Sequence, residues 1–159
     1  MSTGGSVVDS YSPQLVRTGI EDVVFGKDVT VVLPTNLYGC ALGNDVFVGP
    51  FVEIQRGVTI GSNTRIQSHS FICEMVSIGS DCFIGHGVVF VNDKLRGGPA
   101  RGDRSLWQST VIGDRVSIGS NASVLPVNIC SDVVVGAGAV VTSDICEPGS
   151  YIGNPARLL

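Results

Sequence analysis

The sequence predicts a parallel β-helix, an all-β solenoid in which short strands wind around one axis. Between Leu42 and Asp93, aliphatic residues recur every six positions, and many of them are followed directly by glycine. A six-residue period is neither the ~3.6 residues of a helical turn nor the alternation of an isolated strand, and a short fixed period is typical of solenoids. Because 43% of the 159 residues are hydrophobic, one domain can form a substantial core.

The six-residue frame divides the chain into three parts. Residues 1–24 show no clear period and are expected to form an N-terminal arm that leads into the first coil. Residues 25–147 carry the frame, which slips by one residue at LYGCA and again at VLPVN. With three six-residue sides per coil, the two framed regions within this span, residues 25–91 and 112–144, amount to roughly five to six coils and a prism about 27 Å long. Residues 148–159 leave the period and contain two prolines, so we expect a cap over the open end.

The frame is interrupted by one inserted loop, at residues 94–109. This loop carries four of the ten basic residues and the only tryptophan, namely Lys94, Arg96, Arg101, Arg104 and Trp107. Two roles fit this composition. Either the loop simply extends into solvent, or its arginines anchor a phosphate-bearing ligand. Trp107 either packs against the protein or stacks on an adenine ring.

The composition argues against several classes of function. The net charge of −4 and the pI near 4.9 do not suit a nucleic-acid-binding surface. With only two histidines in the chain, a three-histidine zinc site would need several copies, so we expect no metal. Neither a signal peptide nor an apolar segment of ~20 residues is visible, which predicts a cytoplasmic protein without a membrane partner. Five cysteines without a CxxC pair are expected to be small, mostly buried residues in a reducing cytosol: Cys40, Cys73, Cys82, Cys130 and Cys146.

The two histidines are predicted to lie close together. Residues 18 apart stack directly in such a solenoid, roughly 4.8 Å from layer to layer. His69 and His86 therefore fall on one side of adjacent coils, and Gly87, which stacks on His69, leaves room beside the ring. A lone histidine in a solenoid is more often a surface residue, but a histidine that titrates near neutrality can also accept a proton in catalysis.

A polar column is predicted on another side of the solenoid. Arg56, Glu74 and Asn92 occupy the same position in three successive coils, where the basic loop departs. Arg56 and Glu74 form either an ordinary surface ion pair of little energetic weight or part of a substrate site.

The block pattern, the segment VGAGAVVTSD and the tail GNPAR resemble the left-handed β-helix acyltransferases of the hexapeptide-repeat superfamily over residues 25–159. More narrowly, NLYGCALGNDVFVGPFVEIQRGVTIG, RIQSHSFICE and FIGHGVVFVNDK are similar to nucleotide-sugar N-acetyltransferases that serve surface-polysaccharide synthesis. This resemblance implies a left-handed β-helix and a homotrimer, with acetyl-CoA in the groove between two prisms. The implied acceptor is a UDP- or dTDP-linked 3-amino-3-deoxy sugar.

The resemblance also implies a set of site residues. The sugar side would be lined by Gln67, His69, Glu74, His86, Asn92 and Asp93. The pantetheine arm would meet the backbone of Gly136, Ala137 and Gly138, and Arg157 would lie near the phosphate end of CoA. We add Arg56 to the substrate residues and Trp107 to the cofactor residues.

Three functions follow in order of preference. In an N-acetyltransferase on a nucleotide-linked amino sugar, His69 or His86 would act as base or orient the acceptor, and Asn92 would orient the sugar or its amine. An acetyltransferase on another acceptor, such as serine, a simple sugar or an antibiotic, is the second possibility. A non-catalytic trimeric scaffold is the third.

Overall fold

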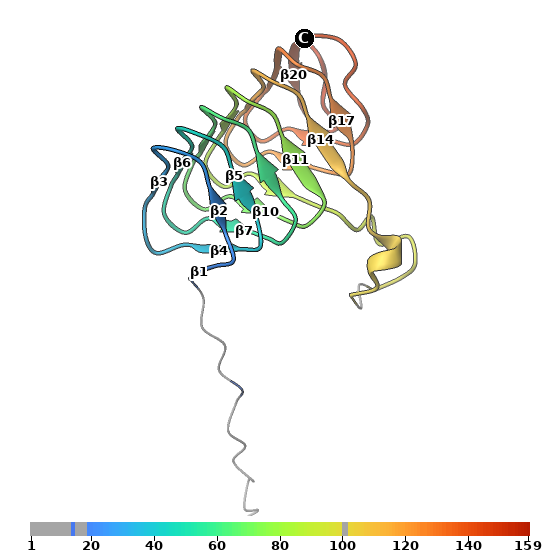
Figure 1. Ribbon diagram of the computed structural model, residues 1–159. Coiled ribbons are helices and arrows are strands. Elements are labelled where there is room, and N and C mark those ends of the chain that lie inside the picture. Colours follow the sequence, from blue (N-terminus) through green and yellow to red (C-terminus); the bar gives the residue numbers. More distant parts are fainter. Residues whose placement is uncertain (1–13, 15–18, 100–101) are drawn as a thin grey trace, which may run out of the picture.

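The computed structural model describes residue 14, residues 19–99 and residues 102–159, and it shows a parallel β-helix with three faces (Figure 1). Face A contains seven strands: β1 (Ile20–Glu21), β4 (Asn36–Tyr38), β7 (Glu53–Ile54), β10 (Phe71–Ile72), β13 (Val89–Phe90), β16 (Ser123–Val124) and β19 (Val140–Val141). Face B contains six: β2 (Val24–Phe25), β5 (Ala41–Leu42), β8 (Thr59–Ile60), β11 (Val76–Ile78), β14 (Thr110–Ile112) and β17 (Asn128–Ile129). Face C contains eight: β3 (Thr30–Val31), β6 (Phe47–Val48), β9 (Arg65–Ile66), β12 (Phe83–Ile84), β15 (Ser117–Ile118), β18 (Val133–Val135), β20 (Gly149–Ile152) and β21 (Arg157–Leu158).

Side chains that point alternately inward and outward along each short strand form the core. In each block an aliphatic residue points inward and a second inward residue precedes it by two positions, as with Val46 and Val48, or Val52 and Ile54, all at most 1% exposed. Some blocks place a hydroxyl at the second inward position, and that hydroxyl donates to a backbone carbonyl. Ser70 Oγ, for example, lies 2.8 Å from Gly85 O, so its burial leaves no unpaired polar atom.

The predicted stacking interval of 18 residues holds in the middle of the solenoid. Ile84 pairs with Ile66, and Ile72 pairs with Ile54. Toward both ends the interval is 17, since Leu37 pairs with Ile54 and Ile118 with Val135. The two one-residue slips in the sequence account for these shorter coils.

Strand pairing extends beyond the segment that carries a readable period. β1 begins at Ile20, before the expected start of the solenoid at residue 25, and pairs with β4. At the other end β20 pairs in parallel with β18, and β21 turns back antiparallel on β20. Face A consequently has seven strands, so the estimate of five to six coils was too low. The period is hard to read at both ends because the interval shortens there, down to 16 residues between Val133 and Gly149.

The cysteines differ in their expected reactivity. Cys40, Cys73 and Cys82 are buried as predicted, Cys130 is half-buried, and Cys146 is exposed. Burial raises the pKa of Cys40 and Cys73 to about 11. Because the thiolate is the reactive form, these two thiols stay protonated and unreactive until the pH approaches that value or the chain unfolds.

We expect an aromatic disulfide reagent at pH 8 to label Cys146 rapidly in the native protein and to label Cys40 and Cys73 only in guanidinium. Mass spectrometry of timed samples reads out each site. In the control variant Cys146→Ser the rapid phase should disappear. Native labelling of Cys40 or Cys73 at the rate of Cys146 would contradict the burial of these thiols.

Candidate active site

The edge between faces C and A, here called the histidine edge, is formed by residues 49–51, 67–69, 85–87, 119–121 and 136–138. Its corner residues stack in a column with left-handed backbone, at φ values between 59° and 69°: Phe51, His69, Gly87, Asn121 and Gly138. Backbone hydrogen bonds join successive layers, such as His69 N to Pro50 O and Gly87 N to Ser68 O. The predicted stacking of Gly87 on His69 is thus present.

The two exposed histidines occupy neighbouring layers of the histidine edge. The His69 ring stacks on the Phe51 ring, with centroids 4.8 Å apart and planes inclined by 13°. His86 Nδ1 lies 2.8 Å from the hydroxyl of Ser68, the residue before His69. If Nδ1–H donates to Ser68, Nε2 of His86 is the free acceptor, which is the tautomer that a general base requires.

Asn121 is a residue of this edge that the sequence argument missed. A Cβ atom on Gly87 would lie 2.5 Å from Asn121 Oδ1, so the Asn121 side chain occupies part of the space expected beside the His69 ring. Adding the lengths of one coil and of the inserted loop to position 87 gives position 121, so the stacking register could have identified Asn121.

Gly136, Ala137 and Gly138 lie on the same edge as the histidines. Gly138 N donates to Ser120 O at 2.8 Å, and Gly138 is two layers beyond Gly87, about 10 Å away. Ile152 packs against Gly136 and pairs with Arg157, whose guanidinium donates to Ala156 O at 2.8 Å. Four of the residues expected to contact CoA, Gly136–Gly138 and Arg157, therefore continue the histidine edge toward the C-terminal cap.

The edge between faces A and B, here called the loop edge, is formed by residues 56–57, 74–75 and 92–109. The inserted loop leaves the prism here and projects away from it, carrying a short 3-10 helix, Arg104–Leu106 (Figure 1). Asn92 stacks on Glu74 as predicted and donates from Nδ2 to Glu74 O at 3.2 Å. Gln108 N donates to Asn92 O at 2.9 Å, so Asn92 also closes the base of the loop.

The ion pair considered between Arg56 and Glu74 is absent from the ion pairs of the described residues. Arg56 lies instead over Gly39, where a Cβ atom would be 3.0 Å from Arg56 Cγ. The partner of Glu74 is Arg104 from the loop, whose Nη2 is 2.5 and 2.6 Å from the two carboxylate oxygens. The Arg104 guanidinium also lies 5.4 Å from the centre of the Trp107 ring.

A pocket of about 280 Å³ lies between the base of the loop and its short helix. Asp93 lines it and accepts a hydrogen bond from Leu95 N at 2.7 Å. Lys94, Arg96 and Trp107 also line this pocket, so a basic and aromatic surface is present there. Arg101 lies outside the described residues.

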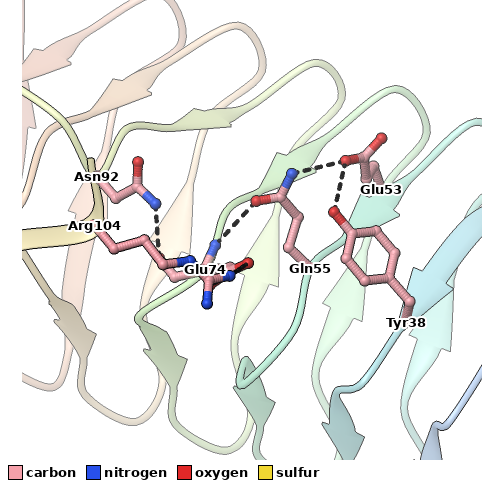
Figure 2. Close-up of polar contacts among 6 residues, drawn as sticks. All are labelled: Tyr38, Glu53, Gln55, Glu74, Asn92 and Arg104. Carbon is pink, nitrogen blue, oxygen red and sulfur yellow. Dashed lines mark hydrogen bonds and ion pairs between the residues drawn. The ribbon is translucent and has the colours of Figure 1, made fainter. Parts of the chain in front are cut away.

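A row of polar side chains on face A extends from Glu74 toward the N-terminal coils (Figure 2). Glu74 N donates to Gln55 Oε1 at 3.2 Å, and Gln55 Nε2 donates to Glu53 Oε1 at 2.9 Å. The Tyr38 hydroxyl lies 3.5 Å from the same Glu53 oxygen. Burial, followed by the nearby carboxylates of Glu53 and Glu74, raises the pKa of Tyr38 and keeps its phenol a donor. These three residues were also missed. The slip at LYGCA obscures the stacking of Tyr38, whereas Glu53 and Gln55 lie inside the clear frame, which does not specify that their side chains turn toward each other.

The predicted site residues thus form two groups within one chain. Gln67, His69, His86 and Gly136–Gly138 share the histidine edge, whereas Arg56, Glu74, Asn92, Asp93 and Trp107 share the loop edge. The coil segment from His69 to Glu74 crosses face A through β10. Face A separates the two groups, so a single chain does not bring them into contact.

Among residues 14, 19–99 and 102–159, no three His, Cys, Asp or Glu side chains gather in a way that could hold a metal ion. The same part of the chain has no helix with the length and hydropathy needed to cross a membrane.

The Arg104–Glu74 ion pair is expected to hold the loop locally without stabilising the whole fold. Arg104 is 62% exposed and Glu74 18% exposed, and a pair of this kind contributes about 1 kcal/mol or less. Glu74→Gln should therefore speed amide hydrogen exchange in residues 94–109 by roughly fivefold and leave global stability within ~1 kcal/mol.

The matched control is Asp132→Asn, which removes the exposed ion pair to Arg115 on a different edge. Exchange of the loop should be the same in this control as in the original protein. Equal loop exchange in Glu74→Gln and the original protein would show that the pair does not restrain the loop.

Comparison with known families and structures agrees with this geometry. The family model described as bacterial transferase hexapeptide matches residues 39–74. A second model, described as hexapeptide repeat of succinyl-transferase, matches residues 75–91 and 109–143. Together these matches include over half of the chain and leave out most of the inserted loop.

Curated relatives include the bifunctional protein GlmU of Clostridium acetobutylicum, 32% identical over 98% of this chain and 36% of its own length. GlmU of Acinetobacter baumannii is 36% identical over 69% of this chain and 22% of its own length. The chain therefore spans only a minor part of the curated relatives it matches.

Solved structures with a similar fold include AntD, an N-acyltransferase from Bacillus cereus in complex with dTDP and coenzyme A (TM-score 0.77, 21% identity, 86% of this chain and 82% of that chain). Perosamine N-acetyltransferase from Caulobacter crescentus, in complex with CoA and GDP-perosamine, has a TM-score of 0.65 at 24% identity over 86% of this chain and 57% of that one. A galactoside acetyltransferase in complex with coenzyme A has a TM-score of 0.64 at 27% identity over 74% and 62%. The repeats, the three parallel faces and these matches lead to one conclusion: the chain belongs to the hexapeptide-repeat family of bacterial transferases and is a left-handed parallel β-helix.

Proposed function

We propose that the protein is an acetyl-CoA-dependent N-acetyltransferase that acts on a UDP- or dTDP-linked 3-amino-3-deoxy sugar. The observation that carries this proposal is the continuity of the histidine edge. His86, with Ser68 on Nδ1, and the small-residue segment Gly136–Gly138 lie on one edge of the prism. A thin pantetheine arm suits such a strip of small residues, and a histidine at its end suits amine acylation.

The structural neighbours support the same chemistry. AntD contains coenzyme A together with dTDP, and perosamine N-acetyltransferase contains CoA together with a nucleotide-linked amino sugar. Both hold coenzyme A together with a nucleotide or a nucleotide-linked compound on the fold seen here. We extend that combination to this chain, with Arg157 near the phosphate end of CoA and Trp107 near its adenine.

Different residues of the histidine edge would then carry out different parts of the reaction. Backbone N–H groups beside the small residues stabilise the negative charge on the thioester oxygen as the C–N bond forms. His86 Nε2 accepts the proton that the amine sheds, while Ser68 holds the ring by Nδ1. When the C–S bond breaks, His86 returns this proton to the departing CoA sulfur, so protons and charges balance.

The separation of the two residue groups supports a trimer with active sites between copies. Glu74, Asn92 and Asp93 lie across face A from the histidines, and the loop projects from the prism beside them. The loop edge of one copy can then complete the histidine edge of the next, in a closed ring of three. We place this trimer in the cytoplasm, where acetyl-CoA is available.

The test is a free-CoA release assay with a panel of UDP- and dTDP-linked 3-amino sugars, combined with native mass spectrometry. We expect turnover of at least one nucleotide-linked amino sugar and a trimeric mass. Failure with all of them, but turnover of a simple sugar, would favour the second candidate, which the 27% identity to galactoside acetyltransferase suggests. If calorimetry detects no binding of acetyl-CoA, a non-catalytic scaffold remains.

A further inference from the structure

A second pocket lies at the N-terminal end of the histidine edge. Its volume is about 250 Å³, and its lining residues are Pro34, Thr35, Asn36, Phe51, Val52 and Glu53; we call it the Glu53 pocket. Phe51 is one layer from His69, about 5 Å, while Gly138 is three layers from His69 in the other direction, about 14 Å. The pocket and the small-residue strip thus approach the histidines from opposite ends of one edge.

Glu53 presents a carboxylate with one oxygen free. Gln55 Nε2 and the Tyr38 hydroxyl both point at Oε1, at 2.9 and 3.5 Å. Within the described residues Oε2 has no hydrogen-bond partner, and Glu53 is in no ion pair. Neutral donors hold this carboxylate in place (Figure 2), and its second oxygen can accept a hydrogen bond from a ligand.

Phe51 gives the same pocket a flat apolar wall. The side chain is 57% exposed, although its ring stacks on His69. A hexose ring has one face of C–H groups and a rim of hydroxyls. It can therefore lie on an aromatic ring while a carboxylate and an amide form hydrogen bonds with the hydroxyls. Glu53 and Asn36 supply these two groups.

We propose that the Glu53 pocket binds the acceptor sugar ring and that Glu53 determines acceptor specificity by accepting a hydrogen bond from a ring hydroxyl. The inference rests on the proposed acetyltransferase function and adds the residue that selects the sugar. Tyr38 and Gln55 are positioning residues, because they contact the Glu53 carboxylate. The donor thioester would reach the histidines from Gly136–Gly138 and the acceptor from the pocket.

The decisive experiment compares Glu53→Gln with the original protein on two acceptors. The first is the nucleotide-linked amino sugar with the highest kcat/KM in the panel, and the second is its analogue that lacks one ring hydroxyl. A hydrogen bond to a charged group is worth roughly 10- to 100-fold in affinity, so KM for the hydroxylated sugar should rise by that factor. KM for the deoxy analogue and for acetyl-CoA should change less than about twofold.

Two further variants separate recognition from a general structural effect. Glu147→Gln removes an exposed carboxylate far from the pocket and should leave both KM values unchanged. Tyr38→Phe should raise KM for the hydroxylated sugar by a smaller factor than Glu53→Gln, at an unchanged melting temperature.

The outcomes distinguish this inference from the proposed function. If the original protein acetylates a nucleotide sugar and Glu53→Gln leaves its KM unaltered, the pocket assignment is overturned and the function stands. An equal rise in KM for both sugars, with a lowered melting temperature, would also overturn it, since that pattern indicates a structural role. If the original protein acetylates none of the panel, both proposals fail together.

Discussion

Phe90→Ala is expected to lower the free energy of unfolding by about 3–5 kcal/mol, since removing a fully buried aromatic side chain costs its transfer energy and leaves a cavity. Phe90 is 0% exposed and is among the largest fully buried side chains. It lies in β13, where it pairs with Val124 of β16, and it is two residues before Asn92 at the base of the inserted loop. Each coil packs only on the coils before and after it, so side chains from elsewhere in the core cannot move in to fill a cavity in this coil.

The measurement is guanidinium unfolding at one fixed protomer concentration, because association contributes to the apparent stability of an oligomer. Phe83→Ala is the matched control: Phe83 is on the outward side of face C and 40% exposed. We expect it to cost under ~1 kcal/mol in the monomeric unit. A loss of similar size in both variants would mean that face C is buried between copies.

His86→Ala is expected to lower kcat/KM by about 100-fold, the lower part of the range for loss of a general base. The physical reason is the contact of Nδ1 with the Ser68 hydroxyl, which leaves Nε2 to accept the proton of the attacking amine. KM for acetyl-CoA should stay within about twofold, since the ring is not expected to bind the donor. Steady-state kinetics with the preferred acceptor, over a pH series, provide the readout.

His69→Ala is the comparison for this variant. Its ring is engaged with Phe51, so we expect its removal to weaken acceptor binding more than turnover. Ser68→Ala should lower kcat/KM by less than His86→Ala does, because the imidazole loses its hydrogen-bond partner at Nδ1 but stays in place. A decrease of less than about threefold in both histidine variants would remove the histidines from the base role.

Much of the fold could be predicted because each coil repeats the same local requirement. Every block repeats an inward aliphatic residue, a second inward residue two positions earlier and a turn. Ile66, Ile84 and Ile118 could therefore be identified as core residues that stack in successive coils. The position of the inserted loop followed from the same frame. The N-terminal limit did not, since β1 pairs with β4 at an interval of 17 and lacks the glycine-marked pattern.

The candidate site was predictable only where it depends on stacking. Counting by 18 residues placed Asn92 on Glu74, and this contact is present. It also placed His86 in the layer next to His69, but the contact of His86 with the Ser68 hydroxyl was not predicted. Counting does not say where a long side chain turns. Arg56 could reach either Glu74 or the space over Gly39, and it takes the second course because the glycine leaves that space open.

The sequence by itself determined the solenoid, the register of its central coils and the two columns of candidate residues, because these depend on a period that every coil repeats. Only the tertiary structure decided the ion pair between Arg104 and Glu74, 30 residues apart, and the row from Glu74 through Gln55 to Glu53. It also decided that face A lies between the two columns. The physical reason is that a repeat specifies the backbone layer by layer, whereas side-chain partners across layers and from an inserted loop depend on reach, free space and charge in three dimensions.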